Sequence, residues 1–112
     1  MITWNNLDTL TSFKELENVE RVDLVKAMAG ENGAERVKNY SVPMAEGLTY
    51  NYAAKQVDDK VLAALAKLAD EAQLTEKFEA LYNGEVINTG EKRLVLHHMT
   101  RGQLGEAVEA DG

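Results

Sequence analysis

The sequence contains no cysteine, and this absence removes several classes of function at once. Without thiols the chain forms no disulfide, performs no thiolate catalysis and offers zinc no cysteine ligands. Positive charge is also in deficit, because 12 Lys and Arg residues face 19 Asp and Glu residues, which gives a net charge of −7. A phosphate backbone would be repelled by this balance, and no basic stripe offsets it. We therefore expect no nucleic acid among the partners of this protein.

Long apolar runs are missing as well. The longest apolar-rich stretch, Val61–Ala69, is interrupted by Lys67 and falls far short of the ~20 residues that a membrane span needs. The first six residues, Met1–Asn6, have neither a basic start nor an apolar run of signal-peptide length. We expect a cytoplasmic protein without a membrane partner.

What remains is a chain of 112 residues that is 45% hydrophobic and 28% charged, which is typical of one folded domain. Apolar residues spaced by three or four predict helices along most of it. We expect helices over Trp4–Leu16, Val19–Ala29 with a further turn at Glu35–Asn39, Lys60–Ala72, from Thr75 to Tyr82, and Glu91–Arg101. The expected N-caps are Thr3 or Asn5, Asp58 and Asp59, Thr75, and Thr89, and the expected helix stops are Gly30, Gly33 and Gly84.

The middle of the chain has a different period. Tyr40–Met44 and Leu48–Tyr52 alternate with period two around Ala45–Gly47, which predicts a short antiparallel β-hairpin around residues 40–53. Pro43 lacks an amide proton and suits an edge strand. The fold class is therefore mainly α (α+β), as a single helical domain over residues 1–112 with a frayed tail at 102–112. We expect the aromatic residues Trp4, Tyr50, Tyr52, Phe78 and Tyr82 to face the core.

Few residues are arranged for chemistry. On a helix over Glu91–Arg101, the side chains of Arg93, His97 and Arg101 would share one face, and such a positive ridge could hold a phosphate. The alternative, which we favour, is scaffolding, with the arginines paired to carboxylates such as Glu85 or Glu91 and His97 bonded to the backbone.

The two histidines are adjacent, so they point about 100° apart on a helix and cannot easily hold one ion. We expect one of His97 and His98 to pack inward with its ring hydrogen-bonded and the other to face water. The Ser/Thr cluster at residues 9–12 lies within a predicted helix and lacks the glycines of a phosphate loop. Acidic pairs such as Asp70 and Glu71 are expected on solvated faces. We assign no catalytic, substrate-binding or metal-binding residue and no cofactor.

One segment carries a more specific signal. Residues 78–101 read FEALYNGEVINTGEKRLVLHHMTR, which resembles the segment M-F-x-G-E-x-I-N-x-T-E-x-R-A-V-L-H-x-A-L-R of the glucose-6-phosphate isomerase (phosphoglucose isomerase) family. The matching positions, which we regard as structural, are Gly84, Glu85, Ile87, Asn88, Glu91, Arg93, Val95, Leu96, His97 and Arg101. Weaker matches lie upstream at Asp23–Val25, Glu35–Ser41 and Asn51–Tyr52, and the chain departs from the family pattern at Ala53, Ala54 and Gly102.

The resemblance implies the N-terminal region of an enzyme that interconverts glucose 6-phosphate and fructose 6-phosphate in glycolysis and gluconeogenesis. In the family a carboxylate base transfers a proton through an enediol after ring opening, without a metal. The residues that do so map to no position of this chain, so we expect an inactive fragment. Its partner would be the rest of the parent chain, which carries the sugar-isomerase domains and forms a homodimer. The alternative is a stand-alone acidic helical protein-interaction module, which the net charge and the lack of an assembled site favour.

Overall fold

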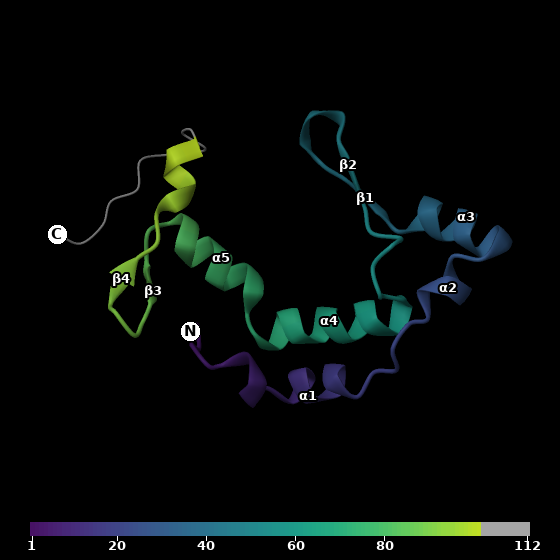
Figure 1. Cartoon of the computed structure of the whole chain (residues 1–112). Coiled ribbons are helices and arrows are strands. Elements are labelled where there is room, and N and C mark those ends of the chain that lie inside the picture. Colours follow the sequence, from purple (N-terminus) through teal and green to yellow (C-terminus); the bar gives the residue numbers. More distant parts are fainter. Residues whose placement is uncertain (102–112) are drawn as a thin grey trace. The chain divides into compact units, whose positions relative to one another are not determined.

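The computed structural model describes residues 1–101, so the predicted tail at 102–112 lies outside the described residues. The chain forms two compact units, one of Met1–Lys14 with the residues from Ala66 on, and one of Glu15–Leu65. Helices make up most of the described regular structure, together with two short antiparallel strand pairs (Figure 1). The predicted fold class, mainly α with a small hairpin, is confirmed.

The unit of residues 15–65 begins with two consecutive helices, α2 at Leu24–Ala27 and α3 at Gly30–Asn39. Asp23 caps α2, because its Oδ1 accepts the Lys26 amide proton at 3.2 Å. The predicted long helix over Val19–Ala29 is therefore wrong for its first half.

The predicted stop at Gly33 is wrong, because this glycine lies within α3, whereas α2 ends shortly before Gly30, whose φ of 58° separates the two helices. Gly33 is buried, and a Cβ atom on it would lie 2.2 Å from the carbonyl oxygen of Met28. The missing side chain lets the first turn of α3 approach the chain that leaves α2. The two glycines together permit a tight junction between α2 and α3.

The predicted β-hairpin is confirmed. Strand β1 (Ser41–Pro43) pairs antiparallel with β2 (Thr49–Asn51), and Val42 lies opposite Tyr50. A 3₁₀ turn, η2 (Ala45–Gly47), connects the strands. Helix α4 follows at Asp59–Glu71, and the carboxylate of Asp58 accepts the Val61 amide proton at 2.9 Å, as the sequence predicted.

The other unit begins with a broken helix. A 3₁₀ turn, η1 (Leu7–Thr9), precedes helix α1 (Thr11–Glu17), and Leu10 between them is extended. The continuous helix predicted from Trp4 to Leu16 is therefore wrong over its first part. The apolar spacing of three that predicted it also fits a 3₁₀ helix, whose period is three residues.

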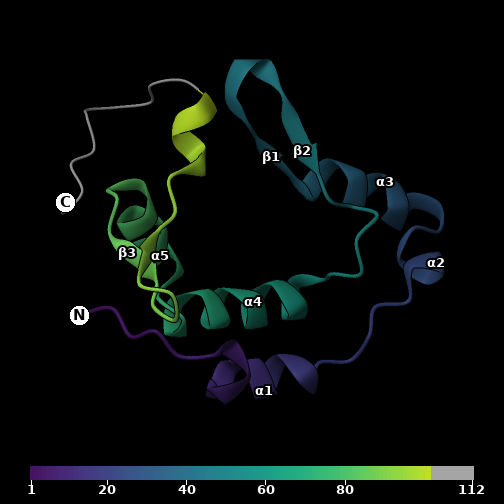
Figure 2. The ribbon, with the colours of Figure 1, turned by 60° about the vertical axis from the view of Figure 1, so that its left-hand side comes forward.

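The N-terminus of α1 is capped from far along the chain. The Glu71 carboxylate, at the end of α4, accepts the Ser12 amide proton at 2.8 Å, the Thr11 amide proton at 3.2 Å and the Ser12 hydroxyl proton. The start of α1 accordingly lies beside the end of α4 (Figures 1 and 2). The caps predicted at Thr3 and Asn5 are therefore wrong. The amides at the start of α1 donate to a carboxylate from another helix, and its negative charge interacts favourably with the helix dipole.

Helix α5 (Leu74–Tyr82) begins one residue before Thr75. The N-cap predicted at Thr75 is therefore wrong. The residue before α5 is Gln73, which has a left-handed backbone with φ of 54°. Its side-chain Oε1 accepts the Thr3 amide proton at 2.8 Å, which attaches the beginning of the chain to this corner.

Helix α5 ends at Gly84, as predicted. The Glu85 amide donates to the Ala80 carbonyl at 2.9 Å and the Gly84 amide to the Leu81 carbonyl at 3.2 Å. With Gly84 at a φ of 76°, this pair of hydrogen bonds forms a Schellman motif, whose left-handed position glycine adopts without steric strain.

A second antiparallel strand pair replaces the predicted last helix. Strands β3 (Val86–Asn88) and β4 (Arg93–Leu94) pair with an irregular register, and a 3₁₀ helix, η3 (His97–Arg101), follows. The helix over Glu91–Arg101 and its cap at Thr89 are therefore wrong. The β-branched residues before an Asn-Thr-Gly sequence favour a strand and a turn, and the helical spacing of Leu94 onward concealed this signal.

The buried residues are small. Among the described residues, the buried apolar side chains are those of Ala53, Ala64, Ala72 and Ala80, and no large side chain is fully buried. Several predicted core aromatics are exposed instead: Trp4 is 40% exposed, Tyr50 47% and Phe78 60%. Tyr52 and Tyr82 are half-buried. Many large apolar side chains of the described residues are therefore exposed to solvent.

The Glu71 cap predicts an acid sensitivity. Hydrogen bonds from the Ser12 side chain and then from its backbone lower the pKa of Glu71 below its ordinary value of 4.5, so folding favours the carboxylate. This stabilisation is complete above pH 4.5 and is lost as the pH falls through the lowered pKa. We expect Ser12→Ala and Glu71→Gln to lower the urea midpoint at pH 7, and the difference from the parent chain to shrink toward pH 3.

The control is Glu79→Gln, which removes a carboxylate from an exposed position of α5. Urea unfolding followed by circular dichroism at a series of pH values between 3 and 7 measures the effect. Equal midpoints for Glu71→Gln and Glu79→Gln at pH 7 would contradict the capping role.

Candidate functional site

The segment that resembles the isomerase family forms a fixed turn. Asn88 Oδ1 accepts the Glu91 amide proton at 3.3 Å, and Asn88 Nδ2 donates to Glu91 Oε2 at the same distance. The Glu91 carboxylate also lies 3.8 Å from the Arg93 guanidinium. These three side chains hold the connection between β3 and β4, where Lys92 has a φ of 54°. The motif residues Asn88, Glu91 and Arg93 therefore shape the backbone.

The structure does not bring Arg93, His97 and Arg101 onto one helical face. Arg93 lies in β4, whereas His97 and Arg101 lie in η3, so the proposed phosphate-binding ridge does not exist in this form. The favoured alternative is confirmed for Arg93, which pairs with Glu91. The hydrogen bond at His97 involves its backbone carbonyl, which accepts from the Thr100 hydroxyl at 2.7 Å.

The remaining motif positions have separate places. Gly84 ends α5, Glu85 is exposed directly after it, and Ile87 is half-buried in β3. Val95 and Leu96 are half-buried between β4 and η3.

The two histidines differ as expected in their burial. His98 is half-buried and its ring stacks on Tyr82 at a centroid distance of 4.6 Å, whereas His97 is exposed. The expected hydrogen bond to the inward ring is not found, because His98 Nδ1 is buried without a partner among the described residues. His98 therefore contributes aromatic contact to the end of α5.

The Ser/Thr cluster at residues 9–12 forms hydrogen bonds with other groups of the protein. Thr9 ends η1, Leu10 is extended, and Thr11 and Ser12 begin α1, so the single continuous helix predicted over the cluster is wrong. An anion could bind the free amides of such a helix start, but the Glu71 carboxylate already accepts from Thr11 and Ser12. Thr9 donates its hydroxyl proton to the Asn6 carbonyl at 2.7 Å. The acidic residue Glu71, expected on a solvated face, is thus a structural acceptor.

No group of three or more His, Cys, Asp or Glu side chains within residues 1–101 is placed to hold a metal ion. None of the helices in that range is long and apolar enough to cross a membrane.

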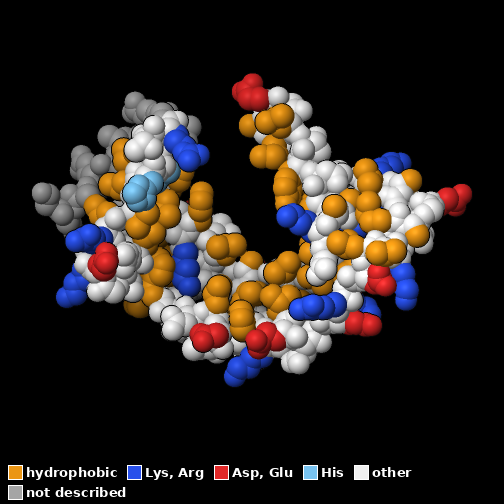
Figure 3. All heavy atoms as spheres, in the orientation of Figure 1, with side chains coloured by type: hydrophobic (Ala, Val, Ile, Leu, Met, Phe, Trp, Pro, Cys, Tyr) orange, Lys and Arg blue, Asp and Glu red, His pale blue; other side chains and the backbone are white. Residues whose placement is uncertain are grey.

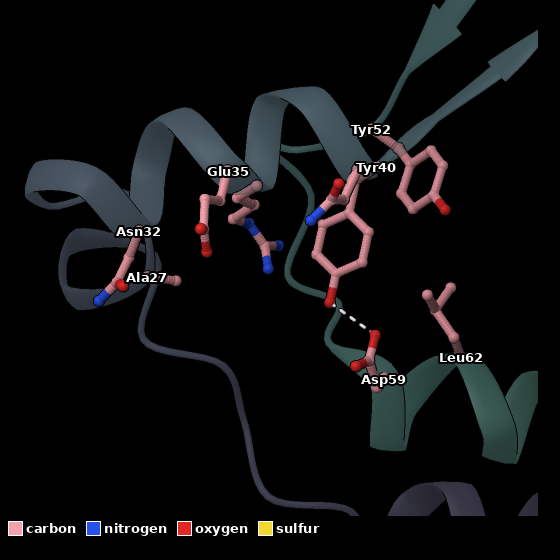
Figure 4. Close-up of a pocket in the computed structure, with 9 residues that line it drawn as sticks. Ala27, Asn32, Glu35, Tyr40, Tyr52, Asp59 and Leu62 are labelled. Carbon is pink, nitrogen blue, oxygen red and sulfur yellow. Dashed lines mark hydrogen bonds between the residues drawn. The ribbon is translucent and has the colours of Figure 1, made fainter.

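A polar pocket of about 500 Å³ lies in the unit of residues 15–65 (Figure 4). Its lining residues come from α2, α3, the hairpin and the start of α4: Ala27, Asn32, Glu35, Arg36, Asn39, Tyr40, Tyr52, Asp59 and Leu62. The Tyr40 hydroxyl points toward Asp59 and donates to its Oδ1 at 3.0 Å (Figure 4). Burial and then this hydrogen bond raise the pKa of Tyr40, so the phenol remains a donor near neutral pH.

Arg36 is a buried charged residue that lines this pocket, and its guanidinium donates three hydrogen bonds to the backbone. Its Nε donates to the Ala53 carbonyl at 2.7 Å, and its Nη2 donates to the carbonyls of Lys55 and Val57 at 2.8 and 2.5 Å. The guanidinium carbon also lies 4.5 Å from the centre of the Tyr40 ring. Arg36 therefore holds the connection between β2 and α4 while it lines the pocket.

Sequence reasoning missed the two side chains that organise the described residues, Arg36 and Glu71. Arg36 carries no sequence signal beyond the weaker resemblance at Glu35–Ser41, and its carbonyl partners lie 17 to 21 residues away. Glu71 serves amides 59 and 60 residues away. Short-range patterns give no signal for either contact.

Comparison with known proteins places this scaffold in a family. The family model described as phosphoglucose isomerase matches residues 51–112. A glucose-6-phosphate isomerase of Treponema denticola is 53% identical over 97% of this chain and 22% of its own length. Those of Treponema pallidum and of Borrelia garinii subsp. bavariensis are 46% and 42% identical over 89% and 99% of this chain, and over 19% and 20% of their own lengths.

The chain belongs to the phosphoglucose isomerase family. It spans about a fifth of the length of the curated relatives that it matches. The resemblance inferred from residues 78–101 is thereby confirmed.

Because the Arg36 guanidinium donates three hydrogen bonds to the backbone, we expect its substitution to lower the stability strongly. Replacing Arg36 by Met removes three hydrogen bonds and leaves the carbonyl oxygens of Ala53 and Val57 without this donor, while the Lys55 carbonyl keeps the Val57 amide; the loss should lower the free energy of unfolding by about 3 kcal/mol. Arg36→Lys should recover only part of this loss, because an ammonium group lacks the planar fork.

The matched control is Lys38→Met, which removes a positive charge from an exposed position of the same helix and should change the free energy by less than about 0.5 kcal/mol. Urea unfolding followed by circular dichroism measures both. Similar losses for the variants at positions 36 and 38 would disprove the role given to Arg36.

Proposed function

We propose that this chain forms the N-terminal structural domain of a glucose-6-phosphate isomerase and supplies none of the reacting groups. The parent enzyme would interconvert glucose 6-phosphate and fructose 6-phosphate, as the family resemblance implies, and the relatives are named glucose-6-phosphate isomerases. The proposal assigns no catalytic, substrate-binding or metal-binding residue to the chain and requires no cofactor.

One observation carries this proposal: the side chains that the family pattern shares with this chain are used to fix its backbone. Asn88, Glu91 and Arg93 interact with one another across a turn, and Gly84 ends a helix. General acid–base catalysis needs a titratable group placed to exchange a proton with the substrate. The perturbed groups, Tyr40 and Glu71, are instead hydrogen-bonded to other parts of the scaffold.

The pattern of burial also supports a structural role. The buried apolar residues among those described are alanines, whereas Val42, Leu48 and Phe78 remain exposed. Exposed apolar patches mark surfaces that bind other polypeptide. The partner we propose is the rest of the isomerase chain, in a cytoplasmic homodimer that binds neither nucleic acid nor membrane. The stand-alone interaction module finds no comparable support, because the relatives reported above are isomerases.

The first test is activity. With fructose 6-phosphate and a coupled readout for glucose 6-phosphate, we expect the 112-residue chain alone to show no turnover above a control without protein. A full-length chimera, in which this chain replaces the matching segment of the Treponema denticola isomerase, should be active within about tenfold of the parent enzyme, or ~1.4 kcal/mol in the barrier.

The control is the same isomerase without the matching segment, which should lose activity because its partner surface is uncovered. Turnover by the isolated chain would refute the absence of reacting groups. A chimera no more active than the truncated isomerase would refute the structural role.

A further inference from the structure

One face of the β1–β2 hairpin carries only apolar and aromatic side chains. Val42 pairs with Tyr50, and the Met44 amide donates to the Leu48 carbonyl at 2.7 Å, so these four residues form two successive cross-strand pairs. Side chains two residues apart along a strand point to the same side. Val42, Met44, Leu48 and Tyr50 therefore share one side, which we call the hairpin face.

The hairpin face is exposed along its whole length. Val42 and Tyr50 are each 47% exposed, Met44 is 57% and Leu48 is 63% exposed. Figure 3 shows apolar side chains gathered along the hairpin. Four neighbouring large apolar side chains make a patch that soluble proteins rarely leave uncovered.

The same surface continues into a shallow apolar pocket of about 370 Å³ within the unit of residues 15–65. The pocket is lined by Val42, Tyr50, Tyr52, Lys55, Val57 and Leu62. It connects the hairpin face with the first turns of α4, where Leu62 is half-buried. The hairpin face thus leads to a recess that can take an apolar side chain from a partner.

The composition of this surface indicates its occupant. Lys55 is the one charged residue that lines the pocket, so the partner surface is apolar and uncharged at its centre. The relatives contain about four fifths of their length beyond what this chain matches, which is ample polypeptide to provide it. A second copy of this chain is a poorer fit, because each copy carries a net charge of −7.

We propose that the hairpin face docks onto an apolar surface of the isomerase polypeptide that this chain lacks. The inference rests on the proposed function and goes beyond it, since it assigns the contact to one side of one hairpin. The opposite side, with Ser41, Pro43, Thr49 and Asn51, then remains free of that contact.

Cysteine labelling tests this assignment, because the chain has no cysteine of its own. Leu48→Cys places a thiol on the hairpin face, and the matched control Thr49→Cys places one at the exposed neighbouring position on the opposite side. Each variant is labelled with a thiol reagent, once as the 112-residue chain and once within the full-length chimera. Mass spectrometry then follows the rate on the peptide that carries the introduced cysteine.

We expect both thiols to react at similar rates in the isolated chain. In the chimera, Leu48→Cys should react at least about tenfold more slowly, equivalent to ~1.4 kcal/mol of protection, and Thr49→Cys should change little. An active chimera in which Leu48→Cys reacts as fast as in the isolated chain would overturn the docking face while leaving the proposed function intact.

Two other outcomes also overturn the docking face. Slow labelling of Leu48→Cys in the isolated chain at every protein concentration would show that the 112 residues cover the face themselves. Labelling that slows only as the concentration rises would show that a second copy covers it. A chimera that neither folds nor catalyses refutes the proposed function and, with it, this inference.

Discussion

The backbone between the hairpin and α4 depends on a single side chain. Arg36, on α3, donates three hydrogen bonds to the carbonyl oxygens of Ala53, Lys55 and Val57, and these lie in the connection from β2 to α4. Removing a guanidinium from water is unfavourable unless its donors find acceptors, and here three carbonyl oxygens accept from Nε and Nη2. The ring of Tyr40 covers the guanidinium, and the Tyr40 hydroxyl reaches Asp59 at the start of α4. The buried Arg36 thus links helix α3 to the segment that connects the β1–β2 hairpin with helix α4.

The segment that identifies the family works by similar means. Gly84 supplies a left-handed residue that ends α5, and Asn88 and Glu91 close the turn between β3 and β4. The family pattern in this region therefore specifies a path of the backbone.

Local signals in the sequence predicted part of this architecture well. The alternation of apolar residues gave the β1–β2 hairpin, Asp58 gave the start of α4, and Gly84 gave the end of α5. Each of these features depends on residues within a few positions of one another. The exposure of Tyr50 and Phe78 could not be predicted in this way, because apolar periodicity marks a face without saying what covers it.

Features set by distant residues were missed for the same reason. The predicted last helix is wrong for a local reason instead, because the helical spacing of Leu94 and the residues after it concealed the turn that hydrogen bonds between Asn88 and Glu91 close. The caps predicted for α1 were sought next to it, yet the acceptor is Glu71. The carbonyl partners of Arg36 are equally remote in sequence. No periodicity argument reaches across such separations.

The long-range cap also affects the order in which the chain acquires structure. The amides of Thr11 and Ser12 cannot be satisfied by Glu71 until about 60 further residues have been synthesised and α4 has reached its last turn. A helix as short as α1 is marginal by itself in water. Helix α1 should accordingly stay open on the ribosome and close late, so a polypeptide cut just before position 71 would lose the order of its first helix along with the missing residues.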